Sequence, residues 1–303
     1  PYGGPHGDGA GNGAASIPVG TSGERAMAIG IGINAVIGDH DAYAMAWHVA
    51  DEAVRNAVIA GADPDELSLL DNFAFGNPNN PDTLGQLVAA CKGCYDAAIN
   101  YNAPFVSGKD SLYNVFVHPD GTADPVAPTL VITAVGIAKQ VDNIPLTGLV
   151  SLGNHVFLIG PAQGALGGSH LDLVYFAGGR GGEVPQPDET AIERHRQLAG
   201  AIAAGFVASA HDPSEGGIAV AASEWAFAGR LGLDLDLASD DATLFGEGPG
   251  RYLVEVAPEN TARFAALVPS ATSIGQVTDS DVVRLGALTL TLDEIESAWK
   301  TQP

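Results

Sequence analysis

Positive charge is the scarcest property of this chain of 303 residues. It has 13 lysine and arginine residues against 36 aspartate and glutamate residues, which gives a formal net charge of −23. A surface of this sign repels DNA, RNA and anionic membranes, so we expect neither a nucleic-acid nor a membrane partner. An anionic small molecule remains compatible with it, because metal ions, single basic side chains and backbone N–H groups decide local binding.

Long apolar runs and cysteines are scarce as well. No apolar run approaches the roughly 18–20 residues that cross a bilayer, and no signal peptide is visible, so we expect a cytoplasmic location. Cys91 and Cys94 form a C-x-x-C pattern within a helical repeat. No second pair of Cys or His residues at metal-ligand spacing completes a zinc site. We therefore expect two reduced thiols that pack a helix.

The length is about twice that of a common domain and predicts two domains. The segment 142–154 is polar and marked by proline and glycine. We place the boundary there, which gives domains over 1–145 and 146–303. The chain begins at Pro1 in a glycine-rich stretch without an initiator methionine, so we expect a truncated start and a longer parent polypeptide.

Apolar periodicity predicts the elements of both domains. In the first domain we expect strands over 26–33, 67–70, 105–107 and 129–137, helices over 43–60 and 82–100, and a hairpin around 119–121. In the second we expect strands over 155–159, 232–237, 251–256 and 272–277, and helices over 189–204, 218–228 and 293–300. Strands, hairpins and helices mixed in this way indicate an α+β fold.

A polar stripe marks the otherwise apolar helix over 43–60. His48, Glu52 and Asn56 recur every four residues and therefore share one face. A carboxylate and an amide one turn apart offer two hard oxygen ligands, which suits Mg²⁺ carrying a nucleotide phosphate. The alternative is a solvated helix face on which Asp51 and Arg55 pair with each other.

Two loops carry further candidate residues. In SGKDSLYN (107–114), Gly108 permits close backbone approach, Lys109 supplies positive charge and Ser111 a hydroxyl, although the spacing of a P-loop is absent. A plain turn held by Asp and Ser side chains is the alternative. In HDPSEGG (211–217), Asp212 either caps the following helix or completes a Mg²⁺ site with Glu52 and Asn56 across a cleft between the domains.

Several segments carry a family resemblance, in one order along nearly the whole chain: PYGGPHGDG, DEAVRN, LLDNFAFGNP, VSGKDSLYN, LGGS and HDPSEGGIAVAASEWAFAG. The chain resembles the second PurM-like half of phosphoribosylformylglycinamidine synthase (FGAM synthase) of the PurL type. The wider superfamily, which includes aminoimidazole ribonucleotide synthetase, selenophosphate synthetase and HypE, lacks the pairing of DNFAFGNP with a later SGKDSLYN. The resemblance implies an α+β fold of two PurM-like α/β domains, one N-terminal and one C-terminal.

The resemblance also implies a reaction. Enzymes of this family convert formylglycinamide ribonucleotide and ammonia to the amidine in purine biosynthesis. ATP phosphorylates the formamide oxygen, and ammonia then displaces the phosphate. Mg²⁺ neutralises the transferring group, and a closed site excludes water. Ammonia comes from a glutaminase, whose nucleophile motif is missing here, so a separate domain or subunit must supply it.

Carried over by motif, Glu52, Asn56 and Asp212 resemble the family's Mg²⁺–nucleotide ligands in this half. The resemblance further implies that Gly108, Lys109 and Ser111 lie in the loop that approaches the substrate, and we count them with Asp212 among the residues that contact nucleotide or substrate. The catalytic histidine of the family belongs to the first PurM-like half. We therefore expect that half as a partner, assign no catalytic residue here, and expect the isolated chain to be inactive.

One position departs from the family pattern. Relatives tend to show Asp-Ala-Ala in the opening loop, with the Asp binding metal, where this chain has Gly13-Ala14-Ala15. That ligand is lost unless Asp8 or Asn12 replaces it. Two alternatives therefore stay open beside half of an active amidoligase. One is a non-catalytic half that holds nucleotide or scaffolds its partner, and the other is a stand-alone homodimeric ATP-dependent enzyme of the wider superfamily.

Overall fold

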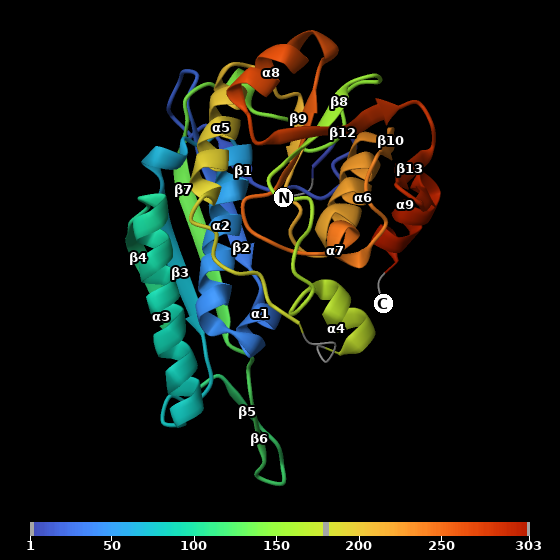
Figure 1. Ribbon diagram of the computed structural model, residues 1–303. Helices are drawn as coiled ribbons and strands as arrows, with labels where there is room; N and C mark the ends of the chain where they lie inside the picture. Colours follow the sequence, from blue (N-terminus) through green and yellow to red (C-terminus); the bar gives the residue numbers. More distant parts are fainter. Residues whose placement is uncertain (1–2, 178–181, 302–303) are drawn as a thin grey trace.

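The computed structural model describes residues 3–177 and 182–301; Pro1 and Tyr2, with which the first motif begins, lie outside the described residues. The first half forms a five-stranded sheet of order β1-β2-β7-β3-β4, in which all pairs are antiparallel except β3–β4. Its elements are β1 (Ala14–Ser16), β2 (Ala26–Ile33), α1 (Ala35–His40), α2 (Ala42–Ile59), β3 (Ser68–Ala74), α3 (Pro81–Tyr101), β4 (Phe105–Ser111) and β7 (Thr129–Ala138). A separate hairpin of β5 (Val115–Val117) and β6 (Ala123–Pro125) projects from this half (Figure 1).

The second half is built on a seven-stranded sheet of order β14-β13-β10-β12-β8-β11-β9. Its strands are β8 (His155–Ile159), β9 (Ser209–His211), β10 (Gly232–Leu235), β11 (Tyr252–Val256), β12 (Ala271–Thr278), β13 (Val282–Leu285) and β14 (Leu288–Thr291). Its helices are α4 (His170–Phe176), α5 (Ala191–Ala203), α6 (Gly217–Gly229), α7 (Asp241–Leu244), α8 (Thr261–Leu267) and α9 (Leu292–Lys300).

Strand β8, between β12 and β11, is buried on both faces and divides the apolar residues into two cores. Phe157 and Ile159 belong to a core that runs through α5 and α8 into the first half, whereas Val156 and Leu158 pack with α6. The first of these cores is therefore shared by the two halves, and the second lies within the second half. No helix among the described residues has both the length and the apolar character needed to span a membrane.

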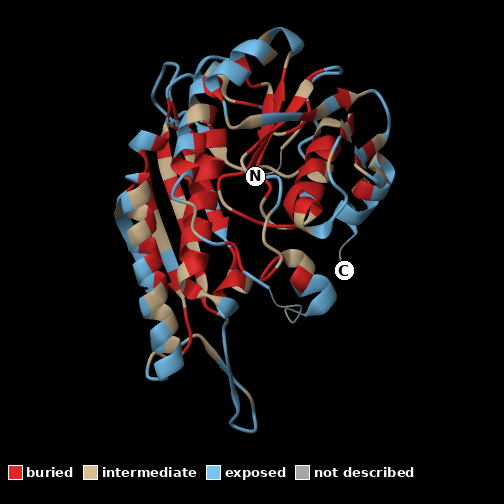
Figure 2. Ribbon diagram, viewed as in Figure 1, coloured by how far each residue is buried: buried red, intermediate tan, exposed pale blue. Residues whose placement is uncertain are grey.

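Helix α2 lies at the centre of the molecule (Figure 2). Every residue of α2 except Tyr43 is buried, because the first sheet, α3 and the second half each cover part of it. Glycines on β2 allow the close approach: a Cβ at Gly30 would lie 2.2 Å from the Ala53 carbonyl oxygen, and one at Gly32 would lie 2.1 Å from that of Val49. Polar side chains on α2 are consequently forced to find partners inside the protein.

The opposite face of the first sheet has no helix over it in the described structure. Met27, Ile31, Ile33 and Ile137 point to this side and are 37%, 50%, 44% and 41% exposed, respectively. A contiguous apolar surface of this kind is typical of a contact with another protein surface. We call it the bare sheet face.

The predicted α+β fold is confirmed, and most of the expected elements form within a few residues of their predicted bounds. One assignment was wrong in kind: Gly108, Lys109 and Ser111 belong to strand β4, which continues to Ser111 because its backbone pairs with β3. The boundary between the domains near residue 145 stays a prediction. Cys91 is exposed and Cys94 buried, so only the second of the two free thiols packs the core.

Candidate functional site

Two predicted ligands, Glu52 and Asn56, lie side by side along the open edge of β2. Strand β1 pairs with β2 only at residues 27–29, and beyond it side chains take over. A Glu52 carboxylate oxygen accepts from the Ile33 N–H at 2.9 Å, and the Asn56 amide donates to the Ile31 carbonyl at 3.0 Å. Both residues thus have a structural role. This role uses one carboxylate oxygen of Glu52 and the amide nitrogen of Asn56, and it leaves the second carboxylate oxygen of Glu52 and the side-chain oxygen of Asn56 for a ligand.

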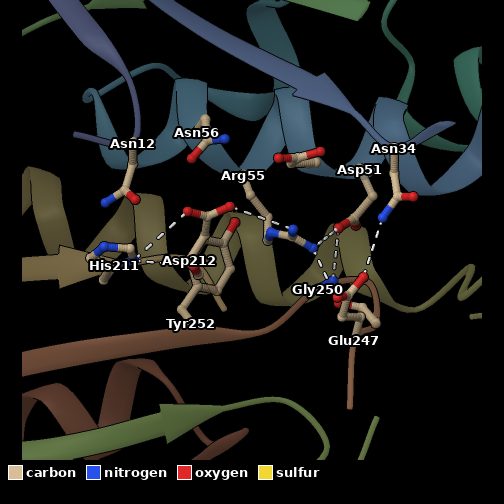
Figure 3. Close-up of polar contacts among 12 residues, drawn as sticks. Asn12, Asn34, Asp51, Arg55, Asn56, His211, Asp212, Glu247, Gly250 and Tyr252 are labelled. Atoms are coloured by element: carbon tan, nitrogen blue, oxygen red, sulfur yellow. Dashed lines mark hydrogen bonds and ion pairs between the residues drawn. The ribbon is translucent and has the colours of Figure 1, made fainter. Parts of the chain in front are cut away.

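The third predicted ligand, Asp212, reaches the same helix from the second half. It directly follows β9, and one of its carboxylate oxygens lies 3.5 Å from a terminal nitrogen of Arg55 without a hydrogen bond between them. Figure 3 shows the Asp212 carboxylate between His211 and Arg55, facing α2. The expectation that Asp212 meets α2 across the boundary between the two halves therefore agrees with this geometry.

Arg55 belongs to a fully buried network centred on Asp51. One Asp51 oxygen accepts from Arg55 at 2.6 Å and from the Gly250 N–H at 2.9 Å. The other accepts from the Tyr101 hydroxyl at 2.9 Å and lies 3.1 Å from His195 Nε2. Burial alone would raise the pKa of Asp51, but Arg55 and His195 outweigh it and the pKa is lowered. The pair is thus an internal bridge between the halves and not the solvated helix face considered from sequence.

Negative charge accumulates around Glu52. Burial raises the pKa of Glu52 well above its ordinary value, and the charges of Glu215 and Asp212 raise it further. Burial likewise raises the pKa of Glu215, with smaller contributions from Asp212 and Glu247. On the same stripe of α2, burial and Arg55 lower the pKa of His48 to about 4, so this histidine is neutral at pH 7. A cation bound among these carboxyl groups would therefore stabilise their ionised forms.

The oxygen atoms present fit a hard cation. Asn56 Oδ1 and Asp212 Oδ2 are buried and have no hydrogen-bond partner within the described structure. Buried polar atoms of this kind usually have a partner, and amide and carboxylate oxygens are ligands that Mg²⁺ accepts. Across residues 3–177 and 182–301, however, no three His, Cys, Asp or Glu side chains are already arranged around a common metal position. Waters and phosphate oxygens would have to complete the shell.

Of the two residues in the opening loop that could replace the missing aspartate, only Asn12 lies near Asp212. Asn12 donates to the Ala210 carbonyl at 3.1 Å, and Figure 3 shows it beside His211 and Asp212. Asp8 instead pairs with Arg230 and Lys300, at 2.9 Å and 3.2 Å, away from this group. A Cβ at Gly13 would lie 2.3 Å from the Asn56 carbonyl oxygen, so the backbone leaves no room for a side chain there.

The other predicted residues lie at the far edge of the first sheet. From β2 to β4 there are three strand spacings, or about 14 Å at roughly 4.8 Å each. A Cβ at Gly108 would lie 2.3 Å from an Asp71 carboxylate oxygen, and Lys109 donates to the Ser111 hydroxyl at 3.2 Å. Within this half, β4 and the group around Glu52 are therefore separate.

Glu247 and His170 were not predicted from the sequence. Glu247 is fully buried and accepts from the N–H groups of His170 and Gly216, at 2.7 Å and 2.9 Å, and from the Asn34 side chain at 3.2 Å. It thereby joins the start of α4 and the loop before α6 to the first half. The available signals were a glutamate flanked by glycines and a histidine following LGGS, neither of which specifies a partner.

Two cavities lie near charged groups. One of about 600 Å³ opens beside Glu247 and is lined also by Gly167, Gly248 and Arg251. Another of about 1090 Å³ lies at the opposite end of α2, where Lys139 and Arg196 are already paired with Asp63 and Asp65. The smaller cavity adjoins Glu247, whereas Glu52, Asn56 and Asp212 are not among the residues that line it.

Comparison with known proteins assigns both halves to one family. Residues 11–138 match the family described as AIR synthase related protein, N-terminal domain, and residues 152–287 match AIR synthase related protein, C-terminal domain. The chain therefore belongs to the superfamily of AIR synthase related, PurM-like proteins, as its motifs indicate.

Solved structures share this fold at low sequence identity. PurL of Thermotoga maritima complexed with FGAR has a TM-score of 0.74 and 15% identity, over 94% of this chain and 48% of that chain. The HypE–HypF complex has a TM-score of 0.60 and 16% identity, over 92% of each chain. AaThiL complexed with AMPPCP and TMP has a TM-score of 0.59 and 16% identity, over 92% of this chain and 88% of that chain. The chain thus spans about half the length of the PurL chain and nearly all of the other two.

Proposed function

We propose that this chain is one half of an ATP-dependent amidoligase that converts formylglycinamide ribonucleotide and ammonia to formylglycinamidine ribonucleotide. The observation that carries the proposal is the approach of Asp212 to α2, the helix that carries Glu52 and Asn56, with one buried oxygen each of Asn56 and Asp212 lacking a hydrogen-bond partner in the described structure. The order of the PurL-type motifs and the likeness to T. maritima PurL complexed with FGAR support the same reaction.

In this proposal the three ligand residues hold Mg²⁺ on the phosphates of a nucleotide. The bound Mg²⁺–nucleotide would supply charge neutralisation for a transferring phosphoryl group. The residues of this chain would position the ligands. Backbone groups of β2 fix Glu52 and Asn56, and Arg55 lies 3.5 Å from Asp212 at the boundary between the halves. The ATP-bound and AMPPCP-bound PurL structures support a nucleotide here by analogy of fold.

The first PurM-like half is the partner that the bare sheet face fits. Met27, Ile31, Ile33 and Ile137 would be buried against the matching sheet of that half. Lys109 and Ser111 lie on the edge strand β4 of the same sheet, so the contact would bring them to a substrate site shared by both halves. A glutaminase domain or subunit would deliver ammonia to that site.

Two alternatives have observations of their own. Gly13 stands where relatives have a metal-binding aspartate, and the surrounding backbone leaves no room for a side chain there. This favours a half that binds nucleotide weakly and only scaffolds its partner. The near-complete coverage of the HypE and ThiL chains favours a stand-alone enzyme that dimerises through the bare sheet face.

Calorimetric titration of the chain with Mg-ATP and Mg-ADP tests the nucleotide site. We expect binding to disappear in Asp212→Ala but not in Asp234→Ala, which removes a half-buried carboxylate of β10 that pairs with Arg284. In the parent enzyme, Glu52→Ala and Asp212→Ala are expected to lower amidoligase turnover at least 100-fold. Unchanged turnover in both variants would leave these residues with a structural role, and absence of nucleotide binding would remove the nucleotide site itself.

A further inference from the structure

Glu247 holds His170 by two separate contacts. It accepts from the His170 backbone N–H at 2.7 Å and lies 3.3 Å from Nδ1 of the same residue. Glu247 has no exposed surface, whereas the His170 side chain is 38% exposed. A buried carboxylate that fixes both the backbone and the ring leaves Nε2 of His170 available to an acceptor outside the protein.

Among residues 3–177 and 182–301, the basic side chains nearest these carboxylates are already engaged within the protein. Arg55 is fully buried and bonded to Asp51 and to the Gly248 carbonyl. Arg251 is buried as well, and its guanidinium donates to the carbonyls of residues 161, 162 and 246. The chain has only four lysines, and each of them is bonded to a side chain elsewhere in the described structure: Lys92 to Asp96, Lys109 to Ser111, Lys139 to Asp63 and Lys300 to Glu296.

We propose that His170, oriented by Glu247, donates from Nε2 to a phosphate oxygen of the nucleotide bound beside Glu52, Asn56 and Asp212. The inference rests on the proposed function, since it adds a protein-borne cation to the same nucleotide site. Glu247 links the two groups: it also accepts from the side chain of Asn34, and the N–H of the adjacent Ile33 donates to Glu52. Glu247 is then a positioning residue, because it orients the imidazole without contacting the nucleotide itself.

The charges facing His170 set the direction of its pH dependence. The hydrogen bond to Glu247 raises the pKa of His170 against the opposing effect of burial, and Glu215, on the loop before α6, raises it further. On α4 itself, Asp172 is turned back to the Gly168 N–H at 3.4 Å. The His170 imidazolium therefore persists to higher pH than that of a free histidine. Its contact with phosphate weakens as pH rises through the pKa of His170.

Calorimetric titration with Mg-ADP between pH 6 and pH 8.5 tests the inference. Relative to His170→Asn, the wild-type chain is expected to bind about fivefold to tenfold more tightly at pH 6, with the difference vanishing at pH 8.5. His118→Asn is the matched control, because His118 also pairs with a carboxylate, Asp124 at 2.6 Å, but on the projecting hairpin. Glu247→Gln should move the wild-type profile to lower pH, and NMR titration of the His170 ring should show its pKa rising when Mg-ADP binds.

The outcomes separate this inference from the proposed function. No Mg-ADP binding at any pH overturns both. Binding with the same pH profile in the wild type and His170→Asn, or a His170 pKa that Mg-ADP leaves unmoved, overturns the role of His170 alone. If Glu247→Gln fails to fold, the comparison of His170→Asn with His118→Asn and the NMR titration still decide the question.

Discussion

Arg55→Met should be among the most damaging single substitutions in this chain. The side chain has no exposed surface, bonds Asp51 at 2.6 Å and lies 3.5 Å from Asp212. Methionine fills a similar volume but leaves the Asp51 carboxylate with the Gly250 N–H, Tyr101 and His195 as its remaining partners. Removing one partner from a buried ion pair costs about 3–5 kcal/mol, because the other charge stays buried without compensation.

Tryptophan fluorescence during urea unfolding measures this loss. Trp47 on α2 and Trp225 on α6 are both buried, so variants that keep only one of them, with the other and Trp299 replaced by phenylalanine, report on the two halves separately. The expected loss of about 3–5 kcal/mol corresponds to a fall of roughly 6–10 °C in unfolding temperature, at about 2 °C per kcal/mol for a chain of this size. Both probes should shift together, since the network around Asp51 joins the halves. Arg284→Met is the control, and its exposed pair with Asp234 should contribute less than about 1 kcal/mol.

The pH dependence provides a second readout of the same network. The pKa of Asp51 is lowered in the folded protein, so its ionised form contributes stability above the unfolded pKa and loses it as pH falls through the folded one. Without Arg55, only His195 and the Gly250 N–H oppose the effect of burial, so the folded pKa of Asp51 rises and protonation of Asp51 destabilises the variant less than the wild type. The stability gap between wild type and Arg55→Met should therefore be largest near pH 7 and narrow toward pH 4.5. A gap below 1 kcal/mol, or one independent of pH, would refute the reasoning.

Four further expectations address the site and its surroundings. Gly13→Asp should lower stability by about 1–3 kcal/mol without improving Mg²⁺ binding in calorimetry, whereas Gly85→Asp, where a Cβ meets no atom within 4 Å, should not force the backbone to move. Glu52→Gln should raise stability at pH 7 by about 1 kcal/mol in urea unfolding and weaken Mg-ADP binding, because a raised carboxyl pKa makes stability fall as pH rises. Ile31→Lys should leave unfolding unchanged but abolish co-purification with the first PurM-like half; retention would contradict the role of the bare sheet face. Lys109→Ala should lower kcat/KM of the parent enzyme about tenfold and leave the Mg-ADP affinity of this half intact, and a loss of affinity would contradict the separation of the two sites.

Local patterns predicted the fold well where one pattern dominates. The helix predicted over 43–60 forms as α2 over Ala42–Ile59, because its apolar residues satisfy packing on all sides. The strand predicted over 105–107 was too short, since Gly108 to Ser111 have little apolar character and are strand only through pairing with β3. Pairing between distant strands leaves no periodic signal in one segment. The local hairpin of β13 and β14 was also missed, and each of its strands is only four residues long.

The site was predictable only in part for the same reason. The spacing of Glu52 and Asn56 follows from helix geometry alone, and a family motif supplied Asp212. By contrast, Glu247 gathers His170, Gly216 and Asn34 from three places in the sequence, so the contact depends on how the two halves are packed. That packing is determined by the shared core and by the Asp51 network, neither of which is visible in a single segment.

The arrangement of α2 ties domain packing to the site. Asp51 and Arg55 are four residues apart, as are Glu52 and Asn56, and a step of one residue turns the helix by about 100°. One pair therefore faces the second half, and the other faces the edge of β2. Asp212 belongs to the second half and lies near Arg55 on α2 of the first half. Any movement between the halves therefore alters the distance from Asp212 to Glu52 and Asn56. The proposed cation site and the contact between the two halves consequently cannot change independently, and a nucleotide bound at this place would stabilise the packing of the two halves by the same contacts.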